Sequence, residues 1–327
     1  MSGSLGLVLG STVGPSKMVD SARAAEKAGF DELWLSEDFF FSGGIAGAGI
    51  ALSATQSIAV GLGVVSALVR HPALLAMEFA TIASAHPGRF LPGIGLGVPA
   101  WMRQMGLMPS SPLAAVRECV STVQRLLTGE VVDHEGAVFE SHDVSLVYRP
   151  QEPLPIRLGV LGPKMLRLSG QIADGSILSV AAGADYVNWA RQRIDEGREQ
   201  AGRASQHSIT VFAIYAIDDD RERARAAARS TLAFYKAAGG RNALTDVAGI
   251  SDDLQEMRAR GGADLIETEM PESWVDELAV AGTPREVRER IGRLFDAGAD
   301  SVALVPAQRE RLPETLALTK AEVIGRI

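Results

Sequence analysis

The sequence predicts a (β/α)8 barrel, also called a TIM barrel, with two insertions. Eight short apolar runs alternate with helical patterns along the chain, and most of these runs are continuously apolar. Parallel strands that are covered on both faces typically have such runs. The length of 327 residues accommodates one barrel of ~250 residues together with the insertions. An open, doubly wound sheet is the competing arrangement.

Each expected strand is followed by an expected helix. The strands are expected at 5–10, 32–36, 57–65, 89–95, 155–161, 175–180, 208–217 and 301–306. The helices are expected at 17–28, 72–85, 112–127, 163–173, 185–202, 221–238, 284–297 and 313–327. Gly29 and Gly298 each follow a helical pattern and precede an apolar run. Glycine is favoured at this position because it ends helices in the left-handed conformation.

Two segments interrupt this alternation. Residues 130–148 alternate between polar and apolar and contain "HEGAVF", which indicates a β-hairpin. Residues 239–282 are rich in glycine and short helical pieces, and we expect a helical insertion before the last strand. Long insertions of this kind shape the rim of a barrel site. We expect one domain over residues 1–327.

Composition excludes several classes of protein. The net charge of −8 argues against general nucleic-acid binding, which needs a basic surface. No apolar run reaches the ~20 residues of a membrane span. Residues 1–15 lack a basic start followed by an apolar segment, so we expect no secretion signal. The single cysteine, Cys119, excludes disulfides within the chain and favours a cytoplasmic protein.

Three common kinds of site are not indicated. The glycine-rich stretches "GLGVVS" (61–66) and "GIGLGVPA" (93–100) do not complete a dinucleotide-binding pattern. The five histidines have no spacing typical of a metal site, so we expect no metal. Cys119 lies in the middle of an expected helix, where a packed thiol is the more frequent outcome than a nucleophile.

The expected helix at 72–85 is apolar on nearly all sides. Its polar members Glu78, Thr81 and Ser84 form one narrow stripe. A helix of this kind is covered on two sides. The barrel covers one side, and we expect a second copy of the chain to cover the other, which predicts a homodimer. The alternative is that the insertions cover it.

Two expected strands end in charged residues, and barrel active sites lie at these ends. In "LWLSEDFFFSGG" (33–44), Glu37 and Asp38 stand beside three phenylalanines, and we expect this pair of carboxylates to move protons. A helix-capping or rim ion-pair role is the alternative. In "GVVSALVRHP" (63–72), Arg70 either binds a phosphate or carboxylate group or forms a structural clamp on Glu78.

The fifth expected strand ends in "GVLGPKMLRLSG" (159–170). Pro163 suits the first turn of a helix, and Gly162 allows a ligand to approach the backbone closely. Free N–H groups and the helix dipole attract an anion there, and Lys164 adds a full positive charge. The alternative is a strand-to-helix turn with a surface lysine.

The sequence resembles the bacterial luciferase-like superfamily, and within it the coenzyme F420-dependent group that includes methylenetetrahydromethanopterin reductase. The resemblance lies in "AGFDELWLSED", "GLGVVSALVRHPALLAMEFATIASAHPGRFLPGIGLG", "GPKMLRLSGQIADGSIL" and "GTPREVRERIGRLFDAGADSVALVP". These stretches span residues 5 to about 306. The resemblance implies a TIM barrel, usually dimeric, with the cofactor at the carboxyl ends of the strands.

The resemblance also implies roles for individual residues. A bulge with a non-proline cis peptide backs the deazaflavin ring in the family, and it maps to Gly63–Val64. The pair after the second strand, Glu37 and Asp38, takes the catalytic position. The cofactor phosphate is held at the start of the fifth-strand helix. The cofactor-binding residues implied or expected are Gly63, Val64, Ser66, Arg70, Gly97, Arg103, Gly162, Pro163 and Lys164.

The sequence departs from the family pattern after the fourth strand. Several F420 enzymes carry a catalytic Glu and an Asn there, but this loop reads "GLGVPAWMRQMG". We therefore expect an apolar substrate pocket, formed by Phe39, Phe40, Trp101 and Trp274. Asp38 also replaces the histidine that sugar-phosphate dehydrogenases of this group carry, which argues against a sugar-phosphate substrate.

We therefore expect an F420-dependent oxidoreductase that transfers a hydride between the deazaflavin and a small organic substrate. One alternative is an FMN-dependent luciferase-like monooxygenase. The other is a non-catalytic protein that binds a flavin or deazaflavin, which only the missing Glu after the fourth strand supports.

Overall fold

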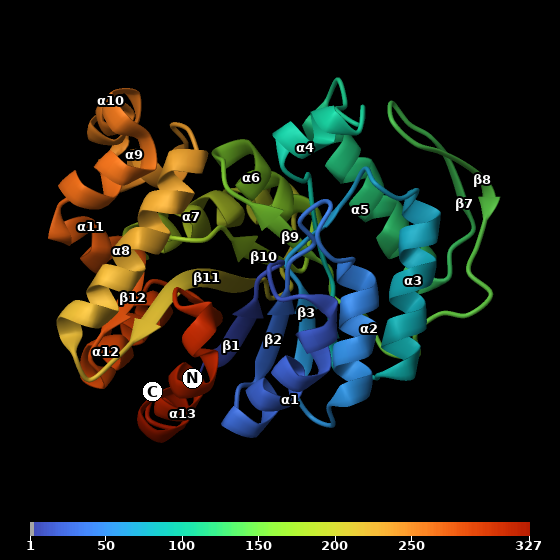
Figure 1. The fold of residues 1–327 in the computed structure, drawn as a ribbon. Helices are drawn as coiled ribbons and strands as arrows, with labels where there is room; N and C mark the ends of the chain where they lie inside the picture. The colour runs from blue at the N-terminus through green and yellow to red at the C-terminus, as the bar shows by residue number, and fades with distance from the viewer. Residues whose placement is uncertain (1–2) are drawn as a thin grey trace.

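The strands of the computed structural model, which describes residues 3–327, close into a parallel barrel (Figure 1). β1 pairs with β2 on one side and with β13 on the other, and the remaining strands complete the circle. Two of the eight positions are interrupted strands, β3 with β4 and β5 with β6. In order, the strands are β1 (Ser4–Leu9), β2 (Glu32–Leu35), β3 (Ala59–Leu62), β4 (Val65–Ser66), β5 (Phe90–Leu91), β6 (Gly93–Gly95), β9 (Arg157–Val160), β10 (Gly175–Leu178), β11 (Ser208–Ile217) and β13 (Ser301–Pro306). The predicted fold class is confirmed.

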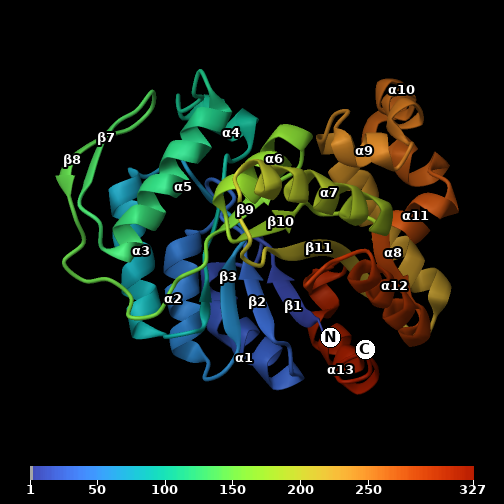
Figure 2. The ribbon, with the colours of Figure 1, turned by 180° about the vertical axis from the view of Figure 1, so that it is seen from behind.

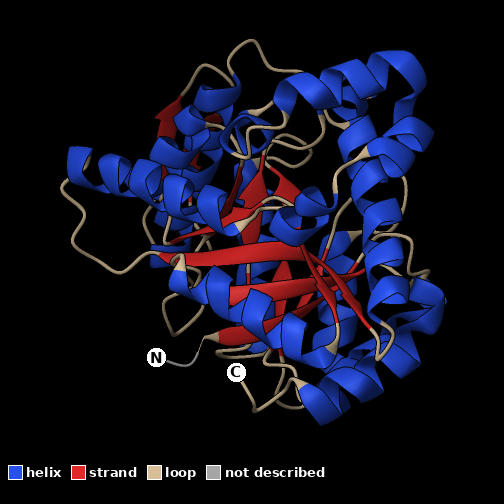
Figure 3. Ribbon diagram, turned by 90° about the vertical axis from the view of Figure 1, so that its left-hand side faces the viewer, coloured by secondary structure: helices blue, strands red, loops and turns tan. Residues whose placement is uncertain are grey.

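Helices surround the strands, as Figure 3 shows from the side. They are α1 (Met18–Ala28), α2 (Gly44–Ala54), α3 (Pro72–Ala85), α4 (Pro99–Gln104), α5 (Pro112–Thr128), α6 (Pro163–Ile172), α7 (Ala184–Gln200), α8 (Arg221–Ala238), α12 (Pro284–Asp296) and α13 (Leu312–Glu322), with short 3-10 turns at η1 (Pro15–Lys17) and η2 (Arg309–Arg311). Every predicted helix is present within a few residues. Among residues 3–327, no helix is both long enough and apolar enough to cross a membrane.

The sequence analysis missed α2 and α4. The α2 segment reads "GIAGAGIALSA", whose glycines and alanines produce no apolar stripe. Tertiary contacts form this helix instead: the Glu37 carboxylate accepts a hydrogen bond from the Gly44 N–H at its start, at 2.8 Å. α2 packs on α1 and on β3, two neighbours that a local pattern does not reveal.

Both predicted insertions are present. The first is the antiparallel hairpin of β7 (Val132–Glu135) and β8 (Glu140–Val144), which stands beside α3 in both views (Figure 2). The second contains α9 (Ala243–Val247), α10 (Ser251–Glu269) and α11 (Glu272–Leu278) and ends in an unpredicted strand, β12 (Ala279–Gly282). Ile214 and Tyr215 of β11 pair with both β12 and β13, so β12 lies on the edge of β11 opposite β13.

Large aromatic side chains fill the inside of the barrel, and glycines make room for them. Trp34 and Phe212 belong to an inner cluster in which their ring centroids are 5.6 Å apart. A Cβ atom added at Gly61 would lie 2.3 Å from the Trp34 ring, and one at Gly63 would lie 2.4 Å from the Phe212 ring. Side chains at these two positions are therefore excluded by the packing of the interior.

Candidate active site

The predicted carboxylates after β2 have different surroundings. The Glu37 carboxylate accepts hydrogen bonds of 2.8 and 2.9 Å from the Arg70 guanidinium, and only 7% of its side chain is exposed. Arg70 also lies 3.3 Å from Glu78 on α3, and its hydrogen bonds to Glu37 raise its pKa. With the contact to the Gly44 N–H, Glu37 links the starts of α2 and α3. These contacts match the alternative roles considered above, in which Glu37 caps a helix and forms an ion pair and Arg70 is a structural clamp.

Asp38 lies in a different polar group at the carboxyl ends of the strands. Its Oδ2 atom accepts a hydrogen bond of 2.6 Å from the Ser11 hydroxyl, which follows β1. Burial raises the pKa of Tyr235 on α8; the charge of Arg309 lowers it and that of Asp38 raises it further. Arg309, after β13, also donates to the Thr12 hydroxyl. Asp38 is therefore a carboxylate without an ion-pair partner among residues 3–327, and the Ser11 hydroxyl is its one side-chain hydrogen-bond partner there.

The segment between β3 and β4 contains a cis peptide bond at Gly63–Val64, as the resemblance implied. The Val64 side chain fits between two glycines of neighbouring strands. A Cβ atom at Gly95 would lie 2.5 Å from Val64, and one at Gly159 would lie 2.8 Å from it. Both Gly63 and Val64 remain half-exposed, so this segment presents a small surface at the barrel mouth.

Ser66 and Gly97 lie together at the ends of β4 and β6. The Ser66 hydroxyl donates to the Leu96 carbonyl at 2.9 Å and accepts from the Leu68 N–H at 3.2 Å. Gly97 has a φ of +97°, and an added Cβ would lie 3.2 Å from the Ser66 hydroxyl. Ser66 is buried and already has hydrogen-bond partners. These two predicted cofactor residues therefore hold the loop in place, and their contact with a cofactor stays a prediction.

Aromatic residues follow the carboxylates and form part of a cavity. The loop 37–43 lines a hollow of about 350 Å³ together with Val69, Arg70 and Met105. Phe39 is buried, with its ring centroid 6.0 Å from that of Trp101 in α4. Phe40 has a φ of +73° and is 69% exposed. The predicted pocket residues Phe39, Phe40 and Trp101 are therefore grouped.

The start of α6 fits an anion. Gly162 precedes the helix without a side-chain hydrogen bond to its first turn, and a Cβ added there would meet nothing within 4 Å. The first N–H groups of the helix and the space in front of them are therefore open. Lys164 is exposed, as is Arg103 of α4, and neither side chain has an ion-pair partner within residues 3–327. A cofactor phosphate therefore fits at Gly162, Pro163 and Lys164.

Trp274 does not join this group. It is 6% exposed and belongs to the main hydrophobic core, where α11 packs on α8 and β12. Its predicted role in a substrate pocket has no support from this packing. The reason is that α11 uses its apolar residues to attach the insertion to the barrel.

The sequence analysis missed a buried lysine on α8. Lys236 is 6% exposed, and burial lowers the pKa of its ammonium group to about 8. It follows Tyr235 in the last turn of the helix. A lysine within the apolar pattern "TLAFYKAA" is the signal in the sequence that indicates this residue. Within the described part of the chain, no cluster of His, Cys, Asp and Glu has a geometry suited to a metal ion.

Comparisons with known proteins agree with this architecture. A family model described as luciferase-like monooxygenase matches residues 4–301. The chain is 30% identical over 289 residues to a 5,10-methylenetetrahydromethanopterin reductase of Archaeoglobus fulgidus, covering 86% of each protein. It is 33% identical over 305 residues to an F420-dependent glucose-6-phosphate dehydrogenase of Nakamurella multipartita, covering 87% of this chain and 85% of the relative.

Two solved structures show the same fold. The coenzyme F420-dependent tetrahydromethanopterin reductase of Methanopyrus kandleri superposes with a TM-score of 0.86 at 24% identity, covering 99% of both chains. An F420-dependent secondary alcohol dehydrogenase superposes with a TM-score of 0.80 at 20% identity, covering 99% of this chain and 98% of the other.

Proposed function

The chain belongs to the luciferase-like monooxygenase family, and we propose on that premise that it is a coenzyme F420-dependent oxidoreductase. It transfers a hydride between the bound deazaflavin and a small organic substrate. The observation that carries this proposal is the pair of relatives with at least 30% identity over most of both chains, a 5,10-methylenetetrahydromethanopterin reductase and an F420-dependent dehydrogenase.

The start of α6 is the proposed phosphate site. The N–H groups after Gly162 point out of the first helical turn, and the helix dipole favours a negative charge there. Lys164 adds a full positive charge beside them. Arg103 is the proposed contact for further acidic groups of the cofactor. These residues bind and orient the cofactor, which supplies the hydride chemistry at its deazaflavin ring when bound.

The ring site lies where Gly63 and Val64 are half-exposed at the barrel mouth. Val64 is fixed between Gly95 and Gly159, so the surface offered to a planar ring is rigid. Asp38 is the proposed catalytic residue, because it is the carboxylate of the pair that has only hydroxyl contact at short range. Its role is to bind a polar group of the substrate and to hold or move a proton there.

We place the substrate beside Phe39, Phe40 and Trp101. Phe39 and Trp101 contact one another and exclude water from one side of the mouth. This wall is apolar, and the hollow of about 350 Å³ beside it admits a small organic molecule. The wall and the carboxylate of Asp38 both disfavour a strongly anionic substrate such as a sugar phosphate at this side of the site.

The protein forms a homodimer through the face of α2 and α3 in this proposal. Leu74 and Met77 on α3 are 53% and 49% exposed, and Ile50 on α2 is 43% exposed. A group of exposed apolar side chains of this kind is typical of a protein–protein interface. Glu78 lies beside it, in the ion-pair network of Arg70.

The decisive experiment is a fluorescence titration of the purified protein with F420 and, separately, with FMN at matched low micromolar concentrations. We expect saturable binding of F420 and no binding of FMN. Lys164→Met should weaken F420 binding at least tenfold, whereas Arg167→Met, which removes a paired surface charge three residues along α6, should not. Binding of FMN alone would overturn the proposal and favour an oxygen-dependent monooxygenase. Binding of F420 with no turnover of any tested acceptor would favour the non-catalytic alternative.

A further inference from the structure

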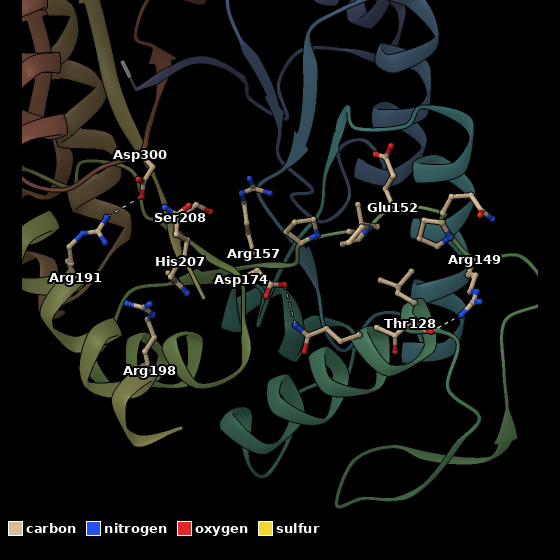
Figure 4. A pocket seen from close by; sticks show the side chains of 18 residues that line it. Thr128, Arg149, Glu152, Arg157, Asp174, Arg191, Arg198, His207, Ser208 and Asp300 are labelled. Carbon is tan, nitrogen blue, oxygen red and sulfur yellow. Dashed lines mark hydrogen bonds and ion pairs between the residues drawn. The ribbon is translucent and has the colours of Figure 1, made fainter. Parts of the chain in front are cut away.

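A cavity lies at the end of the barrel opposite the candidate active site. It has a volume of about 1240 Å³ and is bounded by α7, the end of α5, the loop 149–155 and the amino ends of four strands, β9, β10, β11 and β13 (Figure 4). Arg157 begins β9, Asp174 precedes β10, and His207 and Ser208 mark the start of β11. This end of a barrel is ordinarily packed. The stability of the fold therefore does not require an open cavity here.

Most charged groups around this cavity are already paired. Arg149 donates to the Thr128 carbonyl at 2.9 Å, and Arg198 donates to Asp195 at 2.8 Å. The acidic groups are paired as well. Asp174 accepts from Arg203 at 2.8 Å and from the Ile156 N–H at 3.0 Å, and Asp300 accepts from Arg191 at 3.2 Å and from the Ile209 N–H at 2.8 Å. These pairs form a rim whose charges largely cancel.

The exceptions are Glu152 and Arg157, whose side chains have no hydrogen-bond or ion-pair partner among residues 3–327. Arg157 lies beside an aromatic ring. Its guanidinium carbon lies 5.9 Å from the centre of the Trp34 ring, and its Nε atom is buried without a hydrogen-bond partner among residues 3–327. The nearest carboxylates attract it without forming an ion pair. The Glu32 carboxylate accepts hydrogen bonds from the Trp34 indole N–H at 2.8 Å and from the Ser301 hydroxyl at 2.6 Å. The Asp174 carboxylate forms its ion pair with Arg203.

A guanidinium nitrogen that is buried without an acceptor is costly, because it has lost water and gained no partner, and this applies to the Nε atom of Arg157. Figure 4 shows Arg157 between His207 and Ser208 on one side and Glu152 and Arg149 on the other, with Asp174 below it. The Ser208 hydroxyl lines the same space. Burial lowers the pKa of His207 to about 4, so its imidazole adds no positive charge there at neutral pH, whereas Arg157 brings a positive charge that has no hydrogen-bond acceptor among residues 3–327.

We propose that this cavity binds a small organic anion whose carboxylate or phosphate group pairs with the Arg157 guanidinium. A guanidinium presents two parallel N–H groups that match either oxyanion. The loop 149–155 supplies Pro150, Pro153, Leu154 and Pro155, which form a rigid apolar wall for the body of the ligand. The ligand carries few negative charges, because the Glu152 carboxylate lines the same cavity and has no ion-pair partner among residues 3–327.

Isothermal titration of the purified protein with inorganic phosphate and with succinate tests this site, with sodium chloride matched for ionic strength. We expect saturable binding of one of these anions at one site per chain. Arg157→Met should weaken that binding at least tenfold, whereas Arg149→Met should change it less than threefold because Arg149 is engaged with Thr128. The anion that binds more tightly identifies the ligand as a carboxylate or a phosphate compound.

A second pair of variants keeps the test valid if Arg157→Met does not fold. Arg157→Lys retains the charge but loses the two-pronged geometry, and Ser208→Ala removes the neighbouring hydroxyl; we expect both to weaken binding. Arg285→Met, which removes an exposed charge on α12 outside the cavity lining, should leave it unchanged. Absence of saturable binding to the wild-type protein overturns the proposal. So does binding that is unchanged in the Arg157 variants or that is lost in Arg285→Met.

Discussion

Glu37 and Asp38 are adjacent and carry the same charge, but their hydrogen-bond partners differ, and we therefore assign them different roles. Glu37 receives three hydrogen bonds from Arg70 and the start of α2, whereas Asp38 receives one from the Ser11 hydroxyl. A carboxylate that is held by a bidentate guanidinium is locked in position and poorly suited to exchange a proton. Chain position alone does not distinguish them, because both follow β2 directly.

The matched amide variants test this division. Asp38→Asn should lower kcat about 100-fold while F420 binding is retained, because the proton-carrying group is lost but its size is kept. Glu37→Gln should lower the free energy of unfolding by about 1–3 kcal/mol and change kcat less than threefold, since it weakens a half-buried ion pair. Steady-state kinetics and urea unfolding measure the two effects. Equal turnover in Asp38→Asn and wild type would contradict the catalytic role.

His207 is expected to make the stability depend on pH. Its pKa is lowered from 6.5 to about 4 in the folded protein, mainly by burial. The unfolded chain therefore binds a proton between pH 6.5 and pH 4 that the folded protein does not, and the free energy of unfolding falls as the pH is lowered through this range. The shift corresponds to about 3 kcal/mol.

Urea unfolding at pH 7.5 and pH 4 measures this loss. Carboxylates contribute to it as well, so His207→Gln is the control: the difference between the two pH values should be smaller in the variant by about 3 kcal/mol. His207 bonds to the Ser176 hydroxyl at 2.9 Å, which Gln can also contact. The same pH dependence in both proteins would show that His207 does not titrate as described.

At the scale of elements, the interrupted strand β3–β4 depends on glycine for packing reasons. Gly63→Ala should lower the free energy of unfolding by about 1–3 kcal/mol, because the new methyl group meets the Phe212 ring inside the barrel. It should also weaken F420 binding, since relief of the clash moves the surface on which the ring lies.

Gly14→Ala is the control for this change. A Cβ at Gly14 meets nothing within 4 Å, and its backbone is extended, with φ −61° and ψ 150°. The substitution should therefore be neutral or raise the free energy of unfolding by up to about 1 kcal/mol. Equal stability and equal F420 binding of Gly63→Ala and Gly14→Ala would contradict this prediction. They would show that the Phe212 ring can move away from a methyl group at position 63.

At the scale of the whole molecule, the exposed apolar face of α2 and α3 predicts the oligomeric state. Leu74→Glu combined with Met77→Glu should convert the dimer to a monomer, because it places charges in an apolar interface. Light scattering coupled to size-exclusion chromatography measures the mass. Phe234→Glu is the control, since Phe234 is 67% exposed on α8, far from α3 in both views (Figures 1 and 2). A monomeric wild-type protein would contradict the prediction.

The order of strands and helices was predictable from the sequence because its signals are local. Apolar runs, Pro163 or Pro72 at helix starts and Gly29 at a helix end act within a few residues of themselves. Helix α2 was not predictable, because a carboxylate from outside the segment satisfies its first turn. Strand β12 was missed for a similar reason, since it is defined by pairing with β11 more than 60 residues earlier.

The sequence by itself determined the barrel, its two insertions and the set of strand ends at which the site is built. Only the tertiary structure decided which of those residues are free to act. Arg70 reaches Glu37 across 33 positions, and Ser11 reaches Asp38 across 27. Trp274 is buried by packing against α8, while Arg157 is left without an acceptor. Charge, burial and hydrogen bonding at a site depend on contacts between distant segments, and no local pattern contains those distances.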